Sequence, residues 1–431
     1  MTIPEKATFA RKASYVYASS TIEQRNQSLI LMKKALVENK EAIFSANQKD
    51  ITSAKEFALD LPLMKRLSFD EKKLEDVLAS IDALIALDDP LNLTILSKEI
   101  AKDLNLYKVT CPLGVLCVIF ESRPDALVQI ASLAIKSGNA ILLKGGKEAR
   151  NTNRALYNAI SSALTQSSMP KDGVVLLETR DEIAQILKLN KEIDLIIPRG
   201  SNAFVQYIMQ NTTIPVMGHA DGICHTYIDE YANPTLAIDV AIDAKTQSYA
   251  VCNAMETLLI HQKIAPTLLP LIANALKDKD VEIRGDEKVC NFIHCKKADN
   301  ADWATEYLDA ILSIKIVSSL QEAIEHINYY GSHHTDCIVT EDTKNASCFT
   351  SSVDSAGVYV NCSTRFADGF RYGFGAEVGI STSKLHARGP VGLEGLCTYK
   401  YILLGKGHTV AQTIDGKIQY THKTIQENCP L

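Results

Sequence analysis

Apolar residues recur at spacings of three and four through the first hundred positions of the chain. The pattern is clearest in IEQRNQSLILMKKALVENKEAIF (22–44) and LEDVLASIDALIALDD (74–89). One apolar stripe on an otherwise polar segment is typical of an amphipathic helix. This region is therefore predicted to be helical, and it presents no chemistry by itself.

The pattern changes after residue 112, where short apolar runs alternate with helix-like segments. The runs are LGVLCVIF (113–120), NAILLK (139–144), GVVLLE (173–178), IDLIIP (193–198) and IPVMG (214–218). Strands that are apolar on both faces and separated by helices predict a parallel sheet covered on both sides. Ligands of such sheets bind at the carboxyl ends of the strands, so a nucleotide is the leading candidate.

A second series of strand and helix patterns begins near Cys224 and predicts a second α/β domain. Its strand-like runs are CHTYID, ETLLIH, VEIRG, TDCIVT and GVYVN. A glycine-rich stretch follows at 365–396, too irregular for one element. Long irregular stretches of this kind usually form functional loops.

Composition narrows the classes of function. A length of 431 residues predicts two or three domains, and a net charge of −6 with scattered cations favours neither nucleic acid nor an anionic membrane. The 11 cysteines lack regular spacing, which indicates reduced thiols rather than a disulfide framework. Without an apolar signal core or a run of about 20 apolar residues, the expected location is the cytoplasm.

One cysteine has an unusual context. In KTQSYAVCNAMETLLIH, Cys252 lies between a helical pattern that ends near Tyr249 and an apolar run at 257–260. A free cysteine usually packs as a small hydrophobic residue. A cysteine in a polar loop at the mouth between two domains could instead act as a nucleophile.

Six stretches, in order along the chain, carry a family resemblance: PLGVLCVIFESRPD, KSGNAILLKGGKEA, IIPRGS, HADGICHTYID, VCNAMETLLIH and RYGFGAEVGISTSKLHARGPVGLEGL. Between about residues 8 and 423 the chain resembles the γ-glutamyl phosphate reductase family, a branch of the aldehyde dehydrogenase superfamily. The resemblance implies an aldehyde dehydrogenase-like α/β fold with three parts. These are an NADPH-binding domain (1–97, 114–223 and 376–397), a catalytic domain (224–375), and a small oligomerisation β-flap with the tail (98–113 and 398–431).

The implied reaction is the NADPH-dependent reduction of L-glutamyl 5-phosphate to L-glutamate 5-semialdehyde and phosphate, in proline biosynthesis. A thioester accepts hydride more readily than a carboxylate does, so Cys252 is the expected nucleophile. The oxyanion is expected to be stabilised by the Cys252 backbone N–H and by Ser122, where the wider superfamily has asparagine.

The resemblance also implies a cofactor site and a substrate site. Lys144 is expected at the cofactor ribose, Lys147 at the 2′-phosphate, and Gly200 and Ser201 at a phosphate before a helix, although the GxGxxG fingerprint is absent. The anionic groups of the substrate call for guanidinium partners from the loops. Arg123 and Arg365 are the first choices, ahead of Arg371 and Arg388.

Other interpretations stay open. A hydrolytic aldehyde dehydrogenase would need a glutamate base where this chain reads GHADG, with His219 in its place. A cofactor-binding homologue without turnover is the third class. Metal binding is disfavoured, since the spacing of Cys290, His294 and Cys295 matches no common zinc motif. Homo-oligomers and a separate glutamate 5-kinase, which would deliver the unstable substrate, are the expected partners.

Overall fold

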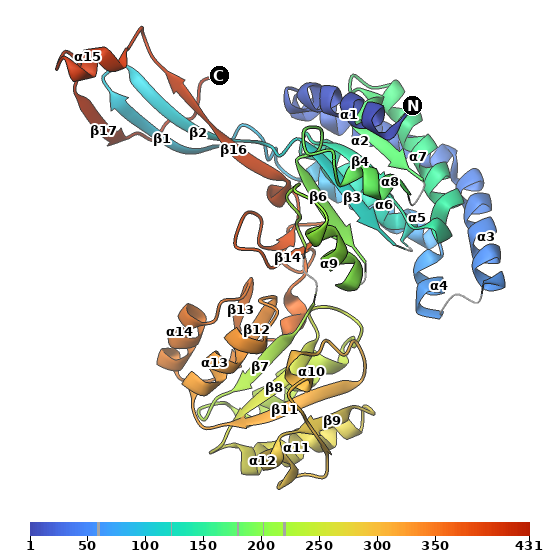
Figure 1. Ribbon diagram of the computed structural model, residues 1–431, viewed down its shortest axis with the longest axis vertical. Coiled ribbons are helices and arrows are strands. Elements are labelled where there is room, and N and C mark those ends of the chain that lie inside the picture. Colours follow the sequence, from blue (N-terminus) through green and yellow to red (C-terminus); the bar gives the residue numbers. More distant parts are fainter. Residues whose placement is uncertain (58–60, 122, 179–180, 201, 219–220) are drawn as a thin grey trace.

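A computed structural model describes the chain from residue 1 to 431 except residues 58–60, 122, 179–180, 201 and 219–220 (Figure 1). Two α/β units, each built on a parallel sheet, follow one another along the long axis of the molecule, and a ribbon of antiparallel strands projects from the first unit. The α/β prediction is confirmed.

The first unit has a four-stranded parallel sheet in the order β5-β4-β3-β6. Its strands are β3 (Val115–Phe120), β4 (Ala140–Lys144), β5 (Val174–Leu177) and β6 (Leu195–Arg199). The strand expected at 214–218 is wrong, because Val216 makes only an isolated bridge to Ile196. Pro215 has no N–H to donate, which limits pairing there.

Helices cover both faces of this sheet. They are α1 (Ile3–Ala18), α2 (Ile22–Glu38), α3 (Lys40–Glu56), α4 (Leu61–Leu67), α5 (Glu71–Ala86), α6 (Pro124–Lys136), α7 (Arg150–Thr165), α8 (Asp181–Ile186) and α9 (Asn202–Gln210). One core joins the sheet to α2, α5, α6 and α7, and another joins it to α1, α8 and α9. The long pattern at 22–44 is two helices, because the chain breaks at Asn39.

The second unit has a seven-stranded parallel sheet in the order β10-β9-β11-β8-β7-β12-β13. The strands are β7 (Cys224–Ile228), β8 (Met255–His261), β9 (Glu282–Gly285), β10 (Lys296–Lys297), β11 (Ile311–Val317), β12 (Thr335–Val339) and β13 (Gly357–Val360). The helices are α10 (Pro234–Thr246), α11 (Ala265–Lys277), α12 (Glu287–Cys290), α13 (Leu320–Tyr330) and α14 (Thr343–Ser352). The sequence analysis did not anticipate β11, whose apolar run is interrupted by Ser313 and Lys315.

The projecting sheet is antiparallel, in the order β16-β2-β1-β17. Its strands are β1 (Thr94–Ala101), β2 (Leu104–Pro112), β16 (Cys397–Leu404) and β17 (Tyr420–Thr424), with the short helix α15 (Val410–Ile414) before the last. A hairpin of β14 (Gly379–Ser381) and β15 (Gly389–Val391) lies between the two units (Figure 1). The residue limits proposed for the three domains stay a prediction.

Candidate active site

Cys252 lies in the loop between α10 and β8, three residues before β8 begins. Its carbonyl oxygen accepts a hydrogen bond from the Cys224 thiol at 3.3 Å. The next residue, Asn253, donates its side-chain amide to the Ala367 carbonyl at 2.8 Å, and its own carbonyl accepts from Thr364 Oγ1 at 2.7 Å. The loop around Cys252 is therefore held by β7 on one side and by the segment after β13 on the other.

The charges around Cys252 favour the protonated thiol. Its pKa is raised to about 12, first by burial and then by the negative charges of Glu306 and Glu377, while Arg199 opposes the shift. Because only a thiolate is strongly nucleophilic, this arrangement describes a resting cysteine. Exposure to solvent, neutralisation of either carboxylate or approach of a positive charge would each lower this pKa.

Two arginines lie within electrostatic reach of this cysteine, and a third, Arg123, acts on one of them. Arg199 is the last residue of β6, and its pKa is lowered by burial and then by nearby Arg123. Arg365 is buried, donates from Nε to the Gln247 side chain at 2.9 Å, and has a pKa that burial lowers. Cys252 acts on the pKa of both Arg199 and Arg365, so both lie within electrostatic reach of the thiol. Guanidinium groups in this arrangement suit an anionic substrate.

The sequence analysis selected Arg123 and Arg365 but missed Arg199. The signal was present in the motif IIPRGS, where a charged residue ends an otherwise apolar strand at the carboxyl edge of the sheet. The other two candidate arginines have different partners. Arg371 donates to the Arg365 carbonyl, and Arg388 forms an ion pair with Asp354 at 2.9 Å.

Two carboxylates near the nucleophile were also missed. Glu306 accepts a hydrogen bond at 3.2 Å from the side chain of Asn202, the first residue of α9. Glu377 accepts the Gly369 N–H at 2.9 Å, and burial raises its pKa. A carboxylate with a raised pKa is a stronger base than an ordinary carboxylate, so Glu377 is a candidate base. No sequence pattern separates these two residues from the other acidic side chains.

The expected cofactor residues differ in their surroundings. Lys144 ends β4, is buried, and donates from Nζ to the Gly145 carbonyl at 2.6 Å; burial lowers its pKa. Asn153 on α7 packs against Gly145, where an added Cβ would lie 2.1 Å from the amide nitrogen of Asn153. The buried Asn153 Oδ1 has no hydrogen-bond partner. Lys144 as a donor, Asn153 as an acceptor and the small Gly145 fit a sugar with free hydroxyl groups.

Two of the remaining predicted site residues are exposed. Lys147 begins the short 3₁₀ turn Lys147–Ala149, and its side chain is exposed. Gly200 is exposed just before α9. Ser122, Ser201 and His219 lie outside the described residues. Within the described part of the chain, no group of three or more His, Cys, Asp or Glu side chains could hold a metal ion.

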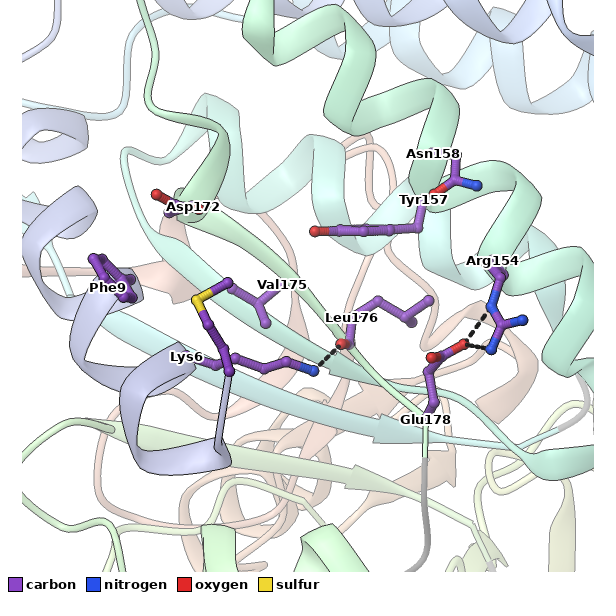
Figure 2. Close-up of a pocket in the computed structure, with 10 residues that line it drawn as sticks. Lys6, Phe9, Arg154, Tyr157, Asn158, Asp172, Val175, Leu176 and Glu178 are labelled. Atoms are coloured by element: carbon purple, nitrogen blue, oxygen red, sulfur yellow. Dashed lines mark hydrogen bonds and ion pairs between the residues drawn. The ribbon is translucent and has the colours of Figure 1, made fainter.

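A separate cavity of about 290 Å³ follows the free edge of β5 (Figure 2). Its described lining comes from α1, α7 and the β5 segment. Lys6 donates to the Leu176 carbonyl at 3.4 Å across the cavity, and Arg154 forms an ion pair with Glu178 at 2.6 Å at one end. This cavity lies in the first unit, and Cys252 is not among the described residues that line it.

Comparisons with known proteins agree with this geometry. The model of the aldehyde dehydrogenase family matches residues 2–302. A γ-glutamyl phosphate reductase from Acetivibrio thermocellus is 53% identical over 431 residues, with 100% of both chains covered. The crystal structure of the reductase of that name from Thermotoga maritima shares 40% identity and a TM-score of 0.92, covering 94% of this chain and 99% of its own.

The yeast reductase of the same name, from Saccharomyces cerevisiae, shares 38% identity over 95% of this chain and 99% of its own, with a TM-score of 0.54. The chain belongs to the aldehyde dehydrogenase family. Within that family it belongs to the γ-glutamyl phosphate reductases, and it is an oxidoreductase of the NAD(P)-using type. No helix in the described ranges is long and apolar enough to cross a membrane.

Proposed function

We propose that this chain reduces L-glutamyl 5-phosphate to L-glutamate 5-semialdehyde and phosphate, through a thioester on Cys252 and with NADPH as the reductant. The name shared by the close relatives supports the substrate. The observation that carries the mechanism is that Cys252 lies within electrostatic reach of Arg199 and Arg365, two cations that suit an acyl phosphate.

In the first step the Cys252 sulfur attacks the acyl carbon. A C–S bond forms, the bond from that carbon to the phosphate oxygen breaks, and phosphate leaves with the electron pair. The thiol proton must pass to a base, and Glu377 is suited to this role because burial raises its pKa. The backbone N–H of Cys252 is the proposed donor to the oxyanion.

The cofactor, when bound, supplies the hydride that reduces the thioester carbon. Lys144 and Asn153, which both contact Gly145, are the proposed partners of its ribose hydroxyls. Lys147 is the proposed partner of the 2′-phosphate, because its exposed ammonium group is free to reach an anion. Collapse of the reduced adduct breaks the C–S bond, releases the aldehyde and returns the sulfur of Cys252.

A hydrolytic aldehyde dehydrogenase is the second candidate, and one observation favours it. Glu306 and Glu377 both act on the Cys252 thiol, and either carboxylate could activate water. The two candidates differ in what opens the thioester, phosphate or water. They are therefore separated by the phosphate requirement of the reverse reaction.

Two kinds of partner belong to the same proposal. The projecting sheet carries exposed apolar side chains, among them Ile95, Tyr401 and Leu403 at 55%, 60% and 56% exposure, which suit packing against a second copy of the chain. Leu403→Asp should then lower the molar mass measured by light scattering.

A glutamate 5-kinase is the proposed donor of the unstable acyl phosphate in the cytoplasm.

The test is to trap the thioester. Glutamyl phosphate is generated in place from glutamate, ATP and a glutamate 5-kinase, without NADPH, and the denatured protein is analysed by mass spectrometry. One glutamyl group should appear on the peptide that carries Cys252. Cys252→Ala should abolish both the adduct and turnover while NADPH still binds, whereas Cys348→Ala, at an exposed cysteine, should change neither. An adduct on another cysteine would contradict the assignment.

A further inference from the structure

Two cysteines outside the active site lie side by side. The sulfur atoms of Cys290 and Cys295 are 3.0 Å apart, and both residues are partly exposed free thiols. A disulfide bond is about 2.0 Å long, so the two atoms need to approach by only about 1 Å to bond. The pair is therefore already placed for a covalent link.

Regular secondary structure holds both cysteines in place. Cys290 ends α12, whose first turn is capped by the Asp286 side chain, and Cys295 directly precedes β10. Both sulfurs pack on Gly285 at the end of β9. An added Cβ on Gly285 would lie 2.7 Å from the Cys295 sulfur, and the Cys290 sulfur is 3.6 Å from the Gly285 carbonyl oxygen. A bond between the sulfurs thus requires them to approach by about 1 Å from positions that the chain already holds close together.

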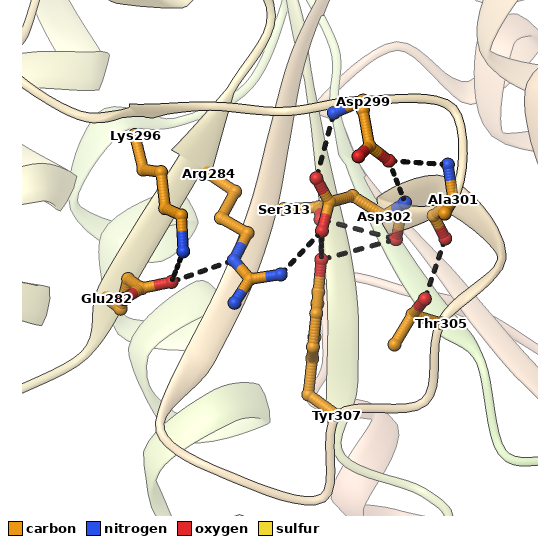
Figure 3. A network of polar contacts seen from close by, with 9 residues as sticks. All are labelled: Glu282, Arg284, Lys296, Asp299, Ala301, Asp302, Thr305, Tyr307 and Ser313. Carbon is orange, nitrogen blue, oxygen red and sulfur yellow. Dashed lines mark hydrogen bonds and ion pairs between the residues drawn. The ribbon is translucent and has the colours of Figure 1, made fainter.

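The segment after Cys295 is also anchored (Figure 3). Lys296 pairs with Arg284 in the β9–β10 ladder and forms an ion pair with Glu282 at 3.6 Å. Arg284 in turn forms an ion pair with Asp302 at 2.7 Å, and Tyr307 donates to Asp302 at 2.8 Å. The cysteine pair therefore lies at the fixed start of the segment that leads to the active-site carboxylate of Glu306.

The two sulfurs share a hydrogen bond in which either can be the donor. Burial, and then this hydrogen bond, raise the pKa of the Cys295 thiol. A thiol with a raised pKa is the poorer nucleophile, so we assign the first reaction with an oxidant to Cys290 and the resolving role to Cys295.

We propose that Cys290 and Cys295 form a modification site that a hydroperoxide converts to an internal disulfide. The Cys290 thiolate attacks one peroxide oxygen, the O–O bond breaks, and hydroxide leaves to give a sulfenic acid. Cys295 then loses its proton, its sulfur attacks the Cys290 sulfur, and the S–O bond breaks. Overall, two thiols and one hydrogen peroxide give one disulfide and two waters. This site is independent of the proposed reductase activity.

Mass spectrometry tests the pair directly, because trypsin cleaves after Lys288 and Lys296 and leaves both cysteines in one peptide, 289–296. The full-length protein is exposed to a small excess of hydrogen peroxide, alkylated with iodoacetamide and digested without reductant. We expect this peptide to lose two hydrogens, to carry no alkyl group, and to return to the doubly alkylated form after dithiothreitol. Cys252, whose thiol stays protonated in the folded chain, should escape oxidation and be alkylated when iodoacetamide is added to the unfolded protein.

Variants complete the test. Cys290→Ser and Cys295→Ser should each abolish the reducible species, whereas Cys348→Ser, at an exposed cysteine, should leave it unchanged. The oxidised parent protein should also melt a few degrees higher than its reduced form, because the link restricts the unfolded chain, and neither serine variant should show this shift. If peptide 289–296 stays doubly alkylated while other cysteines are oxidised, the proposal is overturned.

Discussion

Gly222 packs against the backbone of Cys252: an added Cβ on Gly222 would lie 2.3 Å from the Cys252 carbonyl oxygen and 2.5 Å from its Cα. Side-chain atoms do not tolerate such approaches, so Gly222→Ala must displace the loop that carries the nucleophile. Because a displacement of about 1 Å can cost about 100-fold in rate, kcat should fall by about that factor. Steady-state kinetics measures the loss.

The matched control is Gly218→Ala. An added Cβ on Gly218 would make an ordinary contact, 3.7 Å from the Pro198 carbonyl oxygen. This variant should retain turnover within about twofold of the parent, as is usual for substitutions that create no strain. Equal losses in the two variants would show that the contact with Cys252 has no special role.

The charges around Cys252 predict how its alkylation depends on pH. With the thiol pKa raised to about 12, the thiolate fraction in the ligand-free protein should grow about tenfold per pH unit between pH 7 and 10, without a plateau. Glu377→Gln removes a charge that raises this pKa and should accelerate the reaction with iodoacetamide at pH 8. Arg199→Gln removes a charge that lowers it and should slow the reaction. Rate changes of the same sign in both variants would contradict the electrostatic account.

Lys147 should set the preference between the two nicotinamide cofactors. Lys147→Glu replaces an exposed ammonium group by a carboxylate that repels a 2′-phosphate, so NADPH should bind about 10- to 100-fold more weakly while NADH is little affected. Titrations of cofactor fluorescence measure both affinities. Lys344, exposed on α14, offers a control position for the same charge change. If Lys147→Glu weakens the binding of NADPH and NADH by the same factor, Lys147 does not bind the 2′-phosphate.

His326 should make the free energy of unfolding decrease as the pH falls. Its pKa is lowered from 6.5 to about 2, first by burial and then by His225 and Lys315, so it stays neutral in the folded chain. Between these values the unfolded chain binds one more proton than the folded chain. The contribution of neutral His326 to the free energy of unfolding is therefore complete above pH 6.5. Below pH 6.5 it falls by about 1.4 kcal/mol per pH unit.

Denaturant unfolding at several pH values between 4 and 7 tests this. In His326→Phe the free energy of unfolding should depend on pH less steeply than in the parent, by about one proton. His422→Gln, at an exposed histidine of β17, should keep the parent slope. If the free energy of unfolding depends on pH as steeply in His326→Phe as in the parent, His326 is not the source of the acid sensitivity.

Local patterns predicted most of the fold because each strand or helix has its own periodicity. The apolar runs at β3, β4, β5 and β6 reflect burial on both faces, which leaves an uninterrupted signal. The interior strand β11 was missed because its buried Ser313 is polar; this side chain is hydrogen-bonded to the Tyr307 hydroxyl at 2.7 Å. A hydrogen-bond partner outside the strand leaves no trace in the strand's own apolar pattern.

The candidate site likewise contains one residue that the local sequence indicates and others that only the tertiary structure brings together. Cys252 stood out because its loop is polar and lies between two elements, features that the local sequence contains. Arg199, Glu306 and Glu377 come from three separate segments and all act on the thiol. Their contribution is electrostatic and depends on the tertiary arrangement. Of the three, only Arg199 leaves a local signal, as the charged end of an apolar strand.

The phosphate requirement of the oxidative reaction tests the central claim most directly. Purified protein is given glutamate 5-semialdehyde and NADP⁺ in a buffer without phosphate, and phosphate or arsenate is then added. Phosphate is already an anionic nucleophile at neutral pH, whereas water needs a positioned base to open the Cys252 thioester. We predict that NADPH formation is nearly absent at first, rises with phosphate until it saturates, and is restored equally by arsenate. Rapid NADPH formation without either anion, with glutamate as the product, would contradict the account and identify a hydrolytic dehydrogenase.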